Sequence, residues 1–203
     1  MRSPKQGNFL NISRLRESIT LSPRQYDTSD LPDRYFNPGE LDVLLHLFEG
    51  AEVIVEFGVN AGRNPAAALR NIPTLRRYVG VDVTCDYRTT LSVQRREVPQ
   101  DPGVLARDDP RFELIVRPRG TFDLSSDDLP RADAVFIDAD HSRVGVENDY
   151  ALAKSIINPG GVIIFHDDNC RRDVEVTQTL NDFVEAGADI KHVSGTWIAF
   201  ERF

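Results

Sequence analysis

Short apolar runs bounded by turn-forming residues recur along most of the chain and predict buried β-strands. Runs of this length that are rich in Val, Ile and Phe are typical of parallel strands covered on both faces. We expect such strands at residues 53–57, 78–82, 112–116, 134–138 and 162–165. Two further apolar runs, 190–193 and 196–200, flank a turn at 194–195 and predict an antiparallel hairpin.

Helical periodicity occupies several of the segments between these strands. Apolar positions at 41, 44, 45 and 48 are spaced as one face of a helix, with Glu40 at a capping-box position and Gly50 after the last turn. Further helices are expected from Asn64 onward, at 146–157 and at about 174–186. This alternation predicts an α/β fold, a doubly wound, mostly parallel, seven-stranded Rossmann-like sheet with an antiparallel C-terminal hairpin.

Two segments lack a clear pattern. Residues 1–36 are polar, carry three prolines and show no periodicity, so we interpret them as an irregular N-terminal arm ahead of a single domain at 37–203. Such an arm is compatible with a cover over the active site or over a neighbouring subunit of a homo-oligomer, and equally with a loosely ordered terminus. Residues 86–110 form a long, arginine-bearing stretch between two predicted strands.

Composition and charge narrow the class of protein. The 203 residues are 40% hydrophobic and 28% charged, which is typical of a soluble globular domain. A net charge of −8 argues against non-specific binding to nucleic acid or to anionic membranes. The apolar run 161–165 is too short to span a bilayer, and residues 1–6 lack the apolar core of a secretion signal. With only Cys85 and Cys170 present, we expect reduced thiols and a cytoplasmic location.

The turn after the first predicted strand has the composition of a cofactor-binding loop. Residues 56–62 read E-F-G-V-N-A-G and lie between that strand and a helix, where doubly wound folds bind small molecules. Its glycines allow a positive φ or a close approach to a ligand. Asn60 stands where the dinucleotide fingerprint needs a glycine, which weakens a nicotinamide interpretation. Asp82 follows Glu56 by 26 positions, close to the spacing of about 20 residues for a ribose-binding carboxylate.

Acidic and histidine residues follow the fourth and fifth predicted strands. Residues 138–141 read D-A-D-H and residues 166–169 read H-D-D-N. One strand–helix–strand unit of about 30 residues separates them, so both clusters are expected at the carboxyl edge of the sheet. Clustered carboxylates repel one another unless a cation is present, and Mg²⁺ prefers oxygen ligands. We therefore expect a metal site at Asp138, Asp167 and Asp168, with the alternative that Asp168 caps a helix and Asp138 holds a loop.

The two histidines of these clusters have different expected roles. His141 directly follows the acids at the end of the fourth strand and is the better candidate for a base that removes a hydroxyl proton. His166 is equally compatible with a packed residue that bonds a backbone carbonyl.

These motifs together resemble a known enzyme family. The glycine loop is similar to motif I of the class I methyltransferases that use S-adenosylmethionine (SAM). Residues 136–142, F-I-D-A-D-H-S, and 159–168, P-G-G-V-I-I-F-H-D-D, resemble the family that includes macrocin O-methyltransferase and its macrolide sugar relatives. A looser similarity extends to catechol O-methyltransferases. The resemblance covers about residues 51–200 and leaves the arm and the 86–110 segment unmatched.

The resemblance implies a SAM-dependent O-methyltransferase assisted by Mg²⁺, with a small-molecule hydroxyl acceptor such as a sugar or another vicinal diol. It implies that Asp138, Asp167 and Asp168 bind the metal, and we expect the unmatched segments to select the acceptor. The expected catalytic residues are Asp138 and His141. The expected cofactor-binding residues, drawn from the loop and from this resemblance, are Glu56, Gly58, Asn60, Gly62, Asp82, Gly120, Thr121 and Asp138.

Other functions remain open at this stage. A nicotinamide-dependent oxidoreductase shares the layer architecture, and a non-catalytic SAM-binding module shares the loop. Methylation of nucleic acid is disfavoured because the arginines between 88 and 119 have acidic neighbours and no N-P-P-Y-type tetrapeptide is present. The same arginines would suit an anionic acceptor, such as a phosphorylated or nucleotide-linked sugar.

Overall fold

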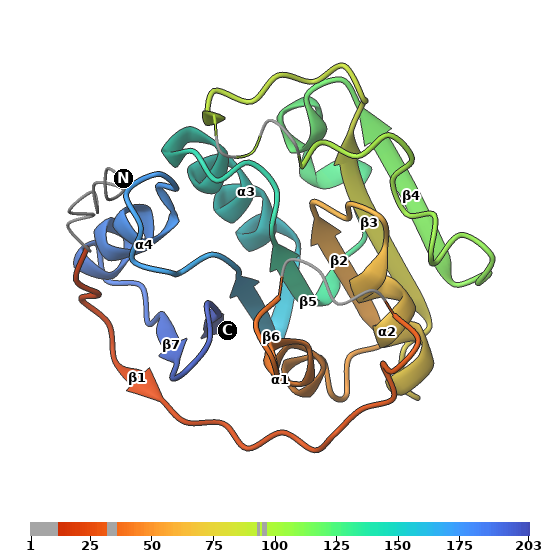
Figure 1. Cartoon of the computed structure of the whole chain (residues 1–203), viewed down its shortest axis with the longest axis horizontal. Helices are drawn as coiled ribbons and strands as arrows, with labels where there is room; N and C mark the ends of the chain where they lie inside the picture. Colours follow the sequence, from red (N-terminus) through yellow and green to blue (C-terminus); the bar gives the residue numbers. More distant parts are fainter. Residues whose placement is uncertain (1–11, 32–35, 93, 95–96) are drawn as a thin grey trace, which may run out of the picture.

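The computed structural model describes residues 12–31, 36–92, 94 and 97–203. Within them the strands form one sheet in the order β1-β7-β8-β6-β5-β2-β3-β4, flanked by helices (Figure 1). The strands β2 to β6 are parallel, β8 is antiparallel to both of its neighbours, and β1 is parallel to β7. The strands are β1 (Ser18–Ile19), β2 (Val53–Phe57), β3 (Arg77–Val83), β4 (Phe112–Arg117), β5 (Ala132–Ile137), β6 (Ile157–Phe165), β7 (Lys191–Val193) and β8 (Ala199–Arg202).

Two hydrophobic layers hold the helices against opposite faces of the sheet. Helices α1 (Glu40–Leu47) and α2 (Arg63–Asn71) bury one face together with Ile54, Phe136 and Ile164. Helices α3 (Arg143–Ile156) and α4 (Val176–Glu185) bury the other face, where the neighbouring positions 55, 135 and 163 point. Successive residues of a strand face opposite sides, so apolar runs without alternation supply both layers.

Strand register brings the predicted site residues to one edge. Phe57 pairs with Ile137 and with Val81, and Ile137 pairs with Phe165. The next residue on each strand therefore stands in one row at the carboxyl edge. That row contains Gly58, Asp138, Asp82 and His166.

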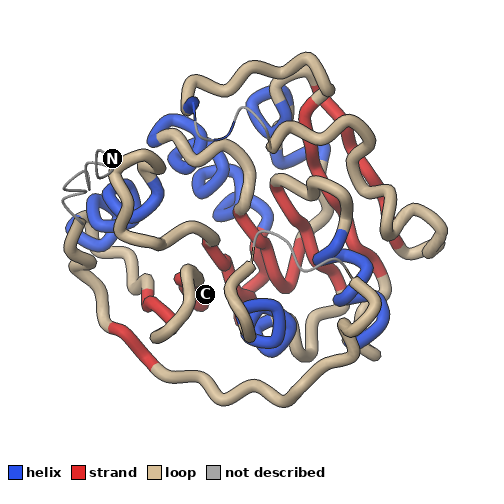
Figure 2. The backbone as a smooth tube through the Cα atoms, viewed as in Figure 1, coloured by secondary structure: helices blue, strands red, loops and turns tan. Residues whose placement is uncertain are grey.

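The predicted α/β class, the mostly parallel sheet and the antiparallel C-terminal pair are confirmed. Over the described residues the sheet has eight strands where the sequence predicted seven, because the arm adds β1 beside β7. The strand expected at 162–165 starts earlier, at Ile157, so residues 158–161 lie inside β6, whose register against β5 is irregular there. Between β3 and β4 the described chain is mostly loop, in keeping with its weak pattern (Figure 2). Among the described residues, no helix combines the length and apolar character that a membrane crossing requires.

Candidate active site

A cavity of about 410 Å³ opens at the carboxyl edge of the parallel strands. This volume lies within the range of roughly 300–1,000 Å³ that is usual for small-molecule sites. Its wall combines the ends of β2, β3, β5 and β6, the 3₁₀ turn η2 (Gly120–Asp123) and the segment that follows β3. The predicted residues that line it are Gly58, Asn60, Asp82, Gly120, Thr121, Asp138, His141 and Asp167.

Gly58 is required by the close packing of two strand ends. Its φ is +89°, and a Cβ at this position would lie 2.1 Å from the backbone oxygen of Asp138. Gly62 also has a positive φ, but a Cβ there would meet the backbone of Gly103, 2.9 Å away. Gly62 therefore packs the loop against the segment after β3 and does not line the cavity, so its contact with a cofactor stays a prediction.

Glu56 also lies behind the cavity wall. Its side chain is fully buried and accepts hydrogen bonds from Asn64 Nδ2 at 2.7 Å and from the Tyr78 hydroxyl at 2.9 Å. Burial raises the pKa of Glu56 to about 8, although both hydrogen bonds act to lower it. Glu56 thus fastens the start of α2 to β3 and thereby shapes the loop that contains Gly58, while its contact with a cofactor stays a prediction.

Asp82 stands at the end of β3 and lines the cavity. Its two carboxylate oxygens accept hydrogen bonds from the backbone amides of Asn60, at 2.8 Å, and Val83, at 2.7 Å. Burial raises the pKa of Asp82 to about 6, and the amide bonds partly oppose the rise. These hydrogen bonds fix the carboxylate that the sequence predicts to bind the ribose of a cofactor.

Thr121 is fixed from behind by α3. Its hydroxyl donates to the Asp149 carboxylate and accepts from Asn148 Nδ2 at 3.1 Å. Asp149 is buried, and burial raises its pKa to about 7. Gly120, with φ +59°, turns the chain so that η2 closes this side of the cavity.

Asp138, His141 and Asp167 form a compact cluster that could hold a metal ion. One ligand atom from each lies within 4.8 Å of the others. His141 Nε2 is 3.3 Å from Asp138 Oδ1 and 3.2 Å from Asp167 Oδ2. Burial alone would lower the pKa of His141, but the two carboxylates raise it above its usual value. We name these three residues the Asp–His–Asp cluster.

His166 is buried and also contacts the two carboxylates of this cluster. Its Nδ1 lies 3.3 Å from Asp138 Oδ1 and 3.5 Å from Asp167 Oδ2, and its Nε2 lies 3.5 Å from buried Glu40. Burial would lower the pKa of His166, but these carboxylates raise it well above 6.5. Phe36 stacks on the ring, with centroids 4.7 Å apart. His166 is thus both packed and charge-paired; the carbonyl bond considered from the sequence is replaced by carboxylate contacts.

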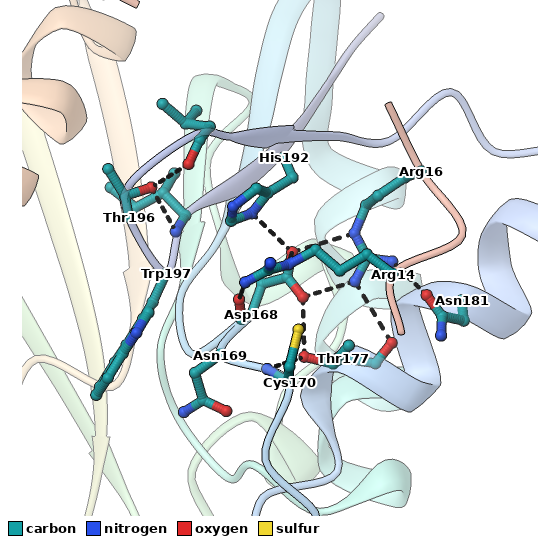
Figure 3. A network of polar contacts seen from close by, with 12 residues as sticks. Arg14, Arg16, Asp168, Asn169, Cys170, Thr177, Asn181, His192, Thr196 and Trp197 are labelled. Carbon is teal, nitrogen blue, oxygen red and sulfur yellow. Dashed lines mark hydrogen bonds and ion pairs between the residues drawn. The ribbon is translucent and has the colours of Figure 1, made fainter. Parts of the chain in front are cut away.

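Asp168 lies apart from the cluster, contrary to the prediction that it is a third metal ligand. Its Oδ1 accepts from Arg16 Nη2 at 2.7 Å and from the Thr177 hydroxyl at 2.9 Å, while Oδ2 accepts from Arg14 Nε at 3.0 Å (Figure 3). His192 Nδ1 is 2.9 Å from the same Oδ2. Both oxygens are occupied, so Asp168 is an internal anchor in this structure and His141 takes its place beside Asp138 and Asp167.

Part of the cavity wall was not predicted from the sequence. Gln94 donates to Ala139 O at 2.9 Å and accepts from the backbone amide of His141 at 2.9 Å. Tyr87 donates to Asp140 Oδ2 at 2.7 Å. Both side chains come from the weakly patterned segment after β3, where polar spacing gives no indication of a contact. Trp197, the only tryptophan of the chain, also lines the cavity.

Comparison with known families identifies the class of protein. Residues 55–167, more than half of the chain, match the model of a family described as a methyltransferase domain. The chain belongs to this methyltransferase domain family. The predicted enzyme class, a methyltransferase, is confirmed, and the nicotinamide oxidoreductase is set aside. The narrower resemblance to macrocin O-methyltransferase stays a prediction.

Solved structures show the same fold. The O-methyltransferase TomG from Streptomyces achromogenes, in complex with SAM, is 17% identical, with a TM-score of 0.55 over 90% of this chain and 92% of TomG. An O-methyltransferase from Bacillus cereus, in complex with SAH, is 20% identical, with a TM-score of 0.52 over 86% of each chain. Cofactor-bound Rv0187 from MTB is 20% identical, with a TM-score of 0.54 over 87% of this chain and 84% of that protein. A comparison with curated protein sequences finds no significant match.

Proposed function

We propose that the protein is a SAM-dependent O-methyltransferase that acts on a small molecule with neighbouring oxygen atoms, such as a sugar or a catechol-like ring. The observation that carries the proposal is the convergence of the Asp–His–Asp cluster, the Gly58 loop and Asp82 on one cavity. The methyltransferase family of the chain and its fold, shared with O-methyltransferases solved with SAM or SAH, support it.

The donor is proposed to occupy the side of the cavity between β2, β3 and η2. Asp82 would accept hydrogen bonds from the ribose hydroxyls, and Gly58 and Asn60 would contact the methionine portion. Thr121, held by Asp149, would stand beside the adenine. SAM supplies a methyl group on a sulfonium centre, and a water-poor cavity favours transfer because positive charge is lost during the reaction.

The Asp–His–Asp cluster fits a divalent cation. Two carboxylates repel each other in a buried site, and a cation between them relieves this repulsion. Mg²⁺ is the proposed ion, and the imidazole nitrogen of His141 also suits Mn²⁺. Bound there, a divalent cation would lower the pKa of an acceptor hydroxyl that coordinates it.

The residues of the chain supply binding and proton transfer. Asp138 and Asp167 hold the imidazole of His141 in place through Nε2 at 3.3 and 3.2 Å. With a cation held by the two carboxylates and the His141 ring left uncoordinated, the neutral imidazole can accept the hydroxyl proton, and the nearby carboxylates then stabilise the imidazolium. A His141 that coordinates the cation instead leaves this proton to solvent. Phe36 and Trp197 give the cavity an apolar border that would exclude water. Orienting donor and acceptor in this way can supply roughly 7–11 kcal/mol of the acceleration.

The test begins with calorimetry of SAM and SAH binding, with and without Mg²⁺ or Mn²⁺. An acceptor screen, read as released SAH, then identifies the substrate. Asp167→Asn should abolish transfer while leaving the Kd for SAH within about twofold, because Asp167 is on the strand β6 side of the cavity. The matched control is Asp189→Asn, at an exposed residue whose carboxylate lies 3.9 Å from Lys191 Nζ.

Two results would contradict the proposal. Full activity of Asp167→Asn in the presence of a chelator would eliminate the metal-assisted mechanism. Tight SAH binding with no transfer to any acceptor, and no response to divalent ions, would favour a non-catalytic SAM-binding module.

A further inference from the structure

We infer that the N-terminal arm is a clamp on the active site, in which Arg14 and Arg16 hold Asp168 and so fix the positions of Asp167 and Trp197. We call Arg14, Arg16 and Asp168 the arginine clamp. The inference deepens the proposed function and depends on it only for the effect on cation binding. Arg14, Arg16 and Asp168 are positioning residues, since none of them lines the cavity.

The clamp contains a buried ion pair that is joined by two hydrogen bonds. Arg16 places Nη2 2.7 Å from Asp168 Oδ1 and Nε 3.2 Å from Oδ2, and neither side chain is exposed to solvent. Arg14 adds a bond from Nε to Oδ2 at 3.0 Å and a short bond from Nη2 to the backbone oxygen of Asp168 (Figure 3). Burial alone would raise the pKa of Asp168, but His192 and the guanidinium groups hold it well below its usual range. Two-pronged pairs of this kind fix geometry as well as charge.

Other contacts set the register of the arm. Asn181 of α4 accepts from the backbone amide of Leu15 at 3.0 Å and donates to Ser13 O at 2.8 Å. Its Oδ1 also accepts from Arg16 Nη1 at 2.8 Å. Beyond Arg16, β1 pairs with β7, where Ser18 stands opposite His192. Residues 12–19 of the arm are therefore attached to the domain by a series of hydrogen bonds along their length.

The clamp acts on the loop that carries Asp167. Asp167 and Cys170 have φ values of +57° and +62°, a left-handed conformation that non-glycine residues adopt only where the surroundings hold it. Asp168 lies between them, and its backbone amide donates to Trp197 O at 2.9 Å. Fixing the Asp168 side chain thus fixes the Asp167 carboxylate on one side and the Trp197 backbone on the other.

Strand order makes the expected effect selective. Asp167 and Trp197 stand at β6 and before β8, whereas Asp82 and Gly120 stand at β3 and η2 on the other side of β5 and β2. Loosening the clamp should therefore disturb the Asp–His–Asp cluster and leave the proposed donor side unchanged.

The two cysteines provide a direct measure of the clamp. Cys85 is exposed, whereas Cys170 is partly buried. Both backbone polar groups of Cys170 form hydrogen bonds. Its oxygen accepts from the backbone amide of Ile12 in the arm at 3.0 Å, and its amide donates to Thr177 Oγ1 at 3.0 Å. Release of the arm would expose Cys170 and leave Cys85 as an internal reference.

The experiment compares two variants of the full chain with a control. Arg14→Ala removes one arginine and keeps the buried Arg16–Asp168 pair, so folding is preserved. The double variant Arg16→Met with Asp168→Asn, called the paired variant, removes both members of the buried ion pair. Arg24→Ala is the control, because this arm arginine forms an exposed pair with Glu49. Each protein is tested by thiol labelling with Ellman's reagent, Trp197 fluorescence, Mn²⁺ titration and SAH calorimetry.

We expect Cys170 labelling to rise about tenfold relative to Cys85 in the paired variant, and less in Arg14→Ala. The Kd for Mn²⁺ should rise about tenfold, as is usual when partners behind a metal ligand are lost. Trp197 emission should shift, while the Kd for SAH stays within about twofold of the wild type. Arg24→Ala should match the wild type in all four measurements.

The inference is overturned if the paired variant unfolds as cooperatively as the wild type and retains its Cys170 rate and Trp197 emission. If the paired variant does not fold, Arg14→Ala decides by the same two readouts. A wild-type protein that binds no SAH contradicts the proposed function alone, since thiol labelling and fluorescence still decide the clamp.

Discussion

Glu56 offers a quantitative test of how the glycine loop is supported. Its carboxyl group is buried between Asn64 and Tyr78, and its pKa is raised to about 8 from an ordinary 4.5. At neutral pH the folded protein therefore keeps this group protonated, whereas the unfolded chain ionises it. Glu56→Gln mimics the protonated form, because its amide oxygen can accept from Asn64 and its NH₂ group can donate to the Tyr78 oxygen.

The direction of the pH effect follows from proton linkage. Between pH 4.5 and pH 8 the folded state binds more protons at Glu56 than the unfolded state does, so the wild type loses stability as pH rises through this window. Each pH unit between the two pKa values corresponds to about 1.4 kcal/mol. From pH 6 to pH 8 the wild type should thus lose on the order of 2 kcal/mol relative to Glu56→Gln, since the loss tapers near the folded-state pKa.

Urea unfolding of both proteins at pH 6, 7 and 8 measures this difference. The free energy of unfolding of the wild type should fall steadily with pH relative to that of the variant, and the difference should be largest at pH 8. Its Kd for SAH should remain within about threefold of the wild type, because Glu56 does not line the cavity. Parallel stability curves would refute the buried, protonated state of Glu56, and a large loss of SAH affinity would refute its place behind the wall.

Three further substitutions test the remaining parts of the site. Asp82→Asn should weaken SAH binding roughly tenfold in calorimetry, since a charged acceptor for ribose hydroxyls is lost; an unchanged Kd would contradict this role. Gly58→Ala should lower the free energy of unfolding in urea by more than about 2 kcal/mol, because its Cβ would collide with the Asp138 backbone; wild-type stability would contradict that contact. Gln94→Ala should reduce methyl transfer about tenfold and leave SAH affinity unchanged, since it frees the His141 loop; equal losses of both would show that Gln94 serves the donor instead.

The sheet could be predicted because each strand except β1 is marked by an apolar run within its own short segment of sequence. Strand β2 has the expected bounds, and the apolar runs at 78–82, 112–116 and 134–138 fall on β3, β4 and β5. The order of helices and strands then places Asp138 and Asp167 at one edge without any knowledge of side-chain contacts. Residues whose role depends on strand position alone were therefore within reach of the sequence.

The errors concern side-chain direction. Glu56 shares its strand face with Ile54, so the period-two alternation of β2 already points it at the α1–α2 layer and away from the strand end. This burial of Glu56 could have been predicted from the sequence. Asp168 could not have been placed in that way, because its direction depends on the left-handed φ of Asp167 and on arginines more than 150 positions away. The two-residue strand β1 depends on the same long-range contacts.

Asp167 and Asp168 are adjacent buried acids, and each carboxylate has its own set of charged partners. An unpaired carboxylate is too costly to bury, and two side by side would force one to keep its proton. Here Asp167 faces two histidines, His141 and His166, whereas Asp168 turns to two arginines of the arm in addition to His192. Histidines can yield to a cation or a substrate proton, but the arginines stay charged and bound. The acid that faces the cavity is thus paired with imidazoles that can lose a proton, whereas the anchoring acid has two guanidinium partners that stay charged, and so a reactive cluster can stand on a fixed support.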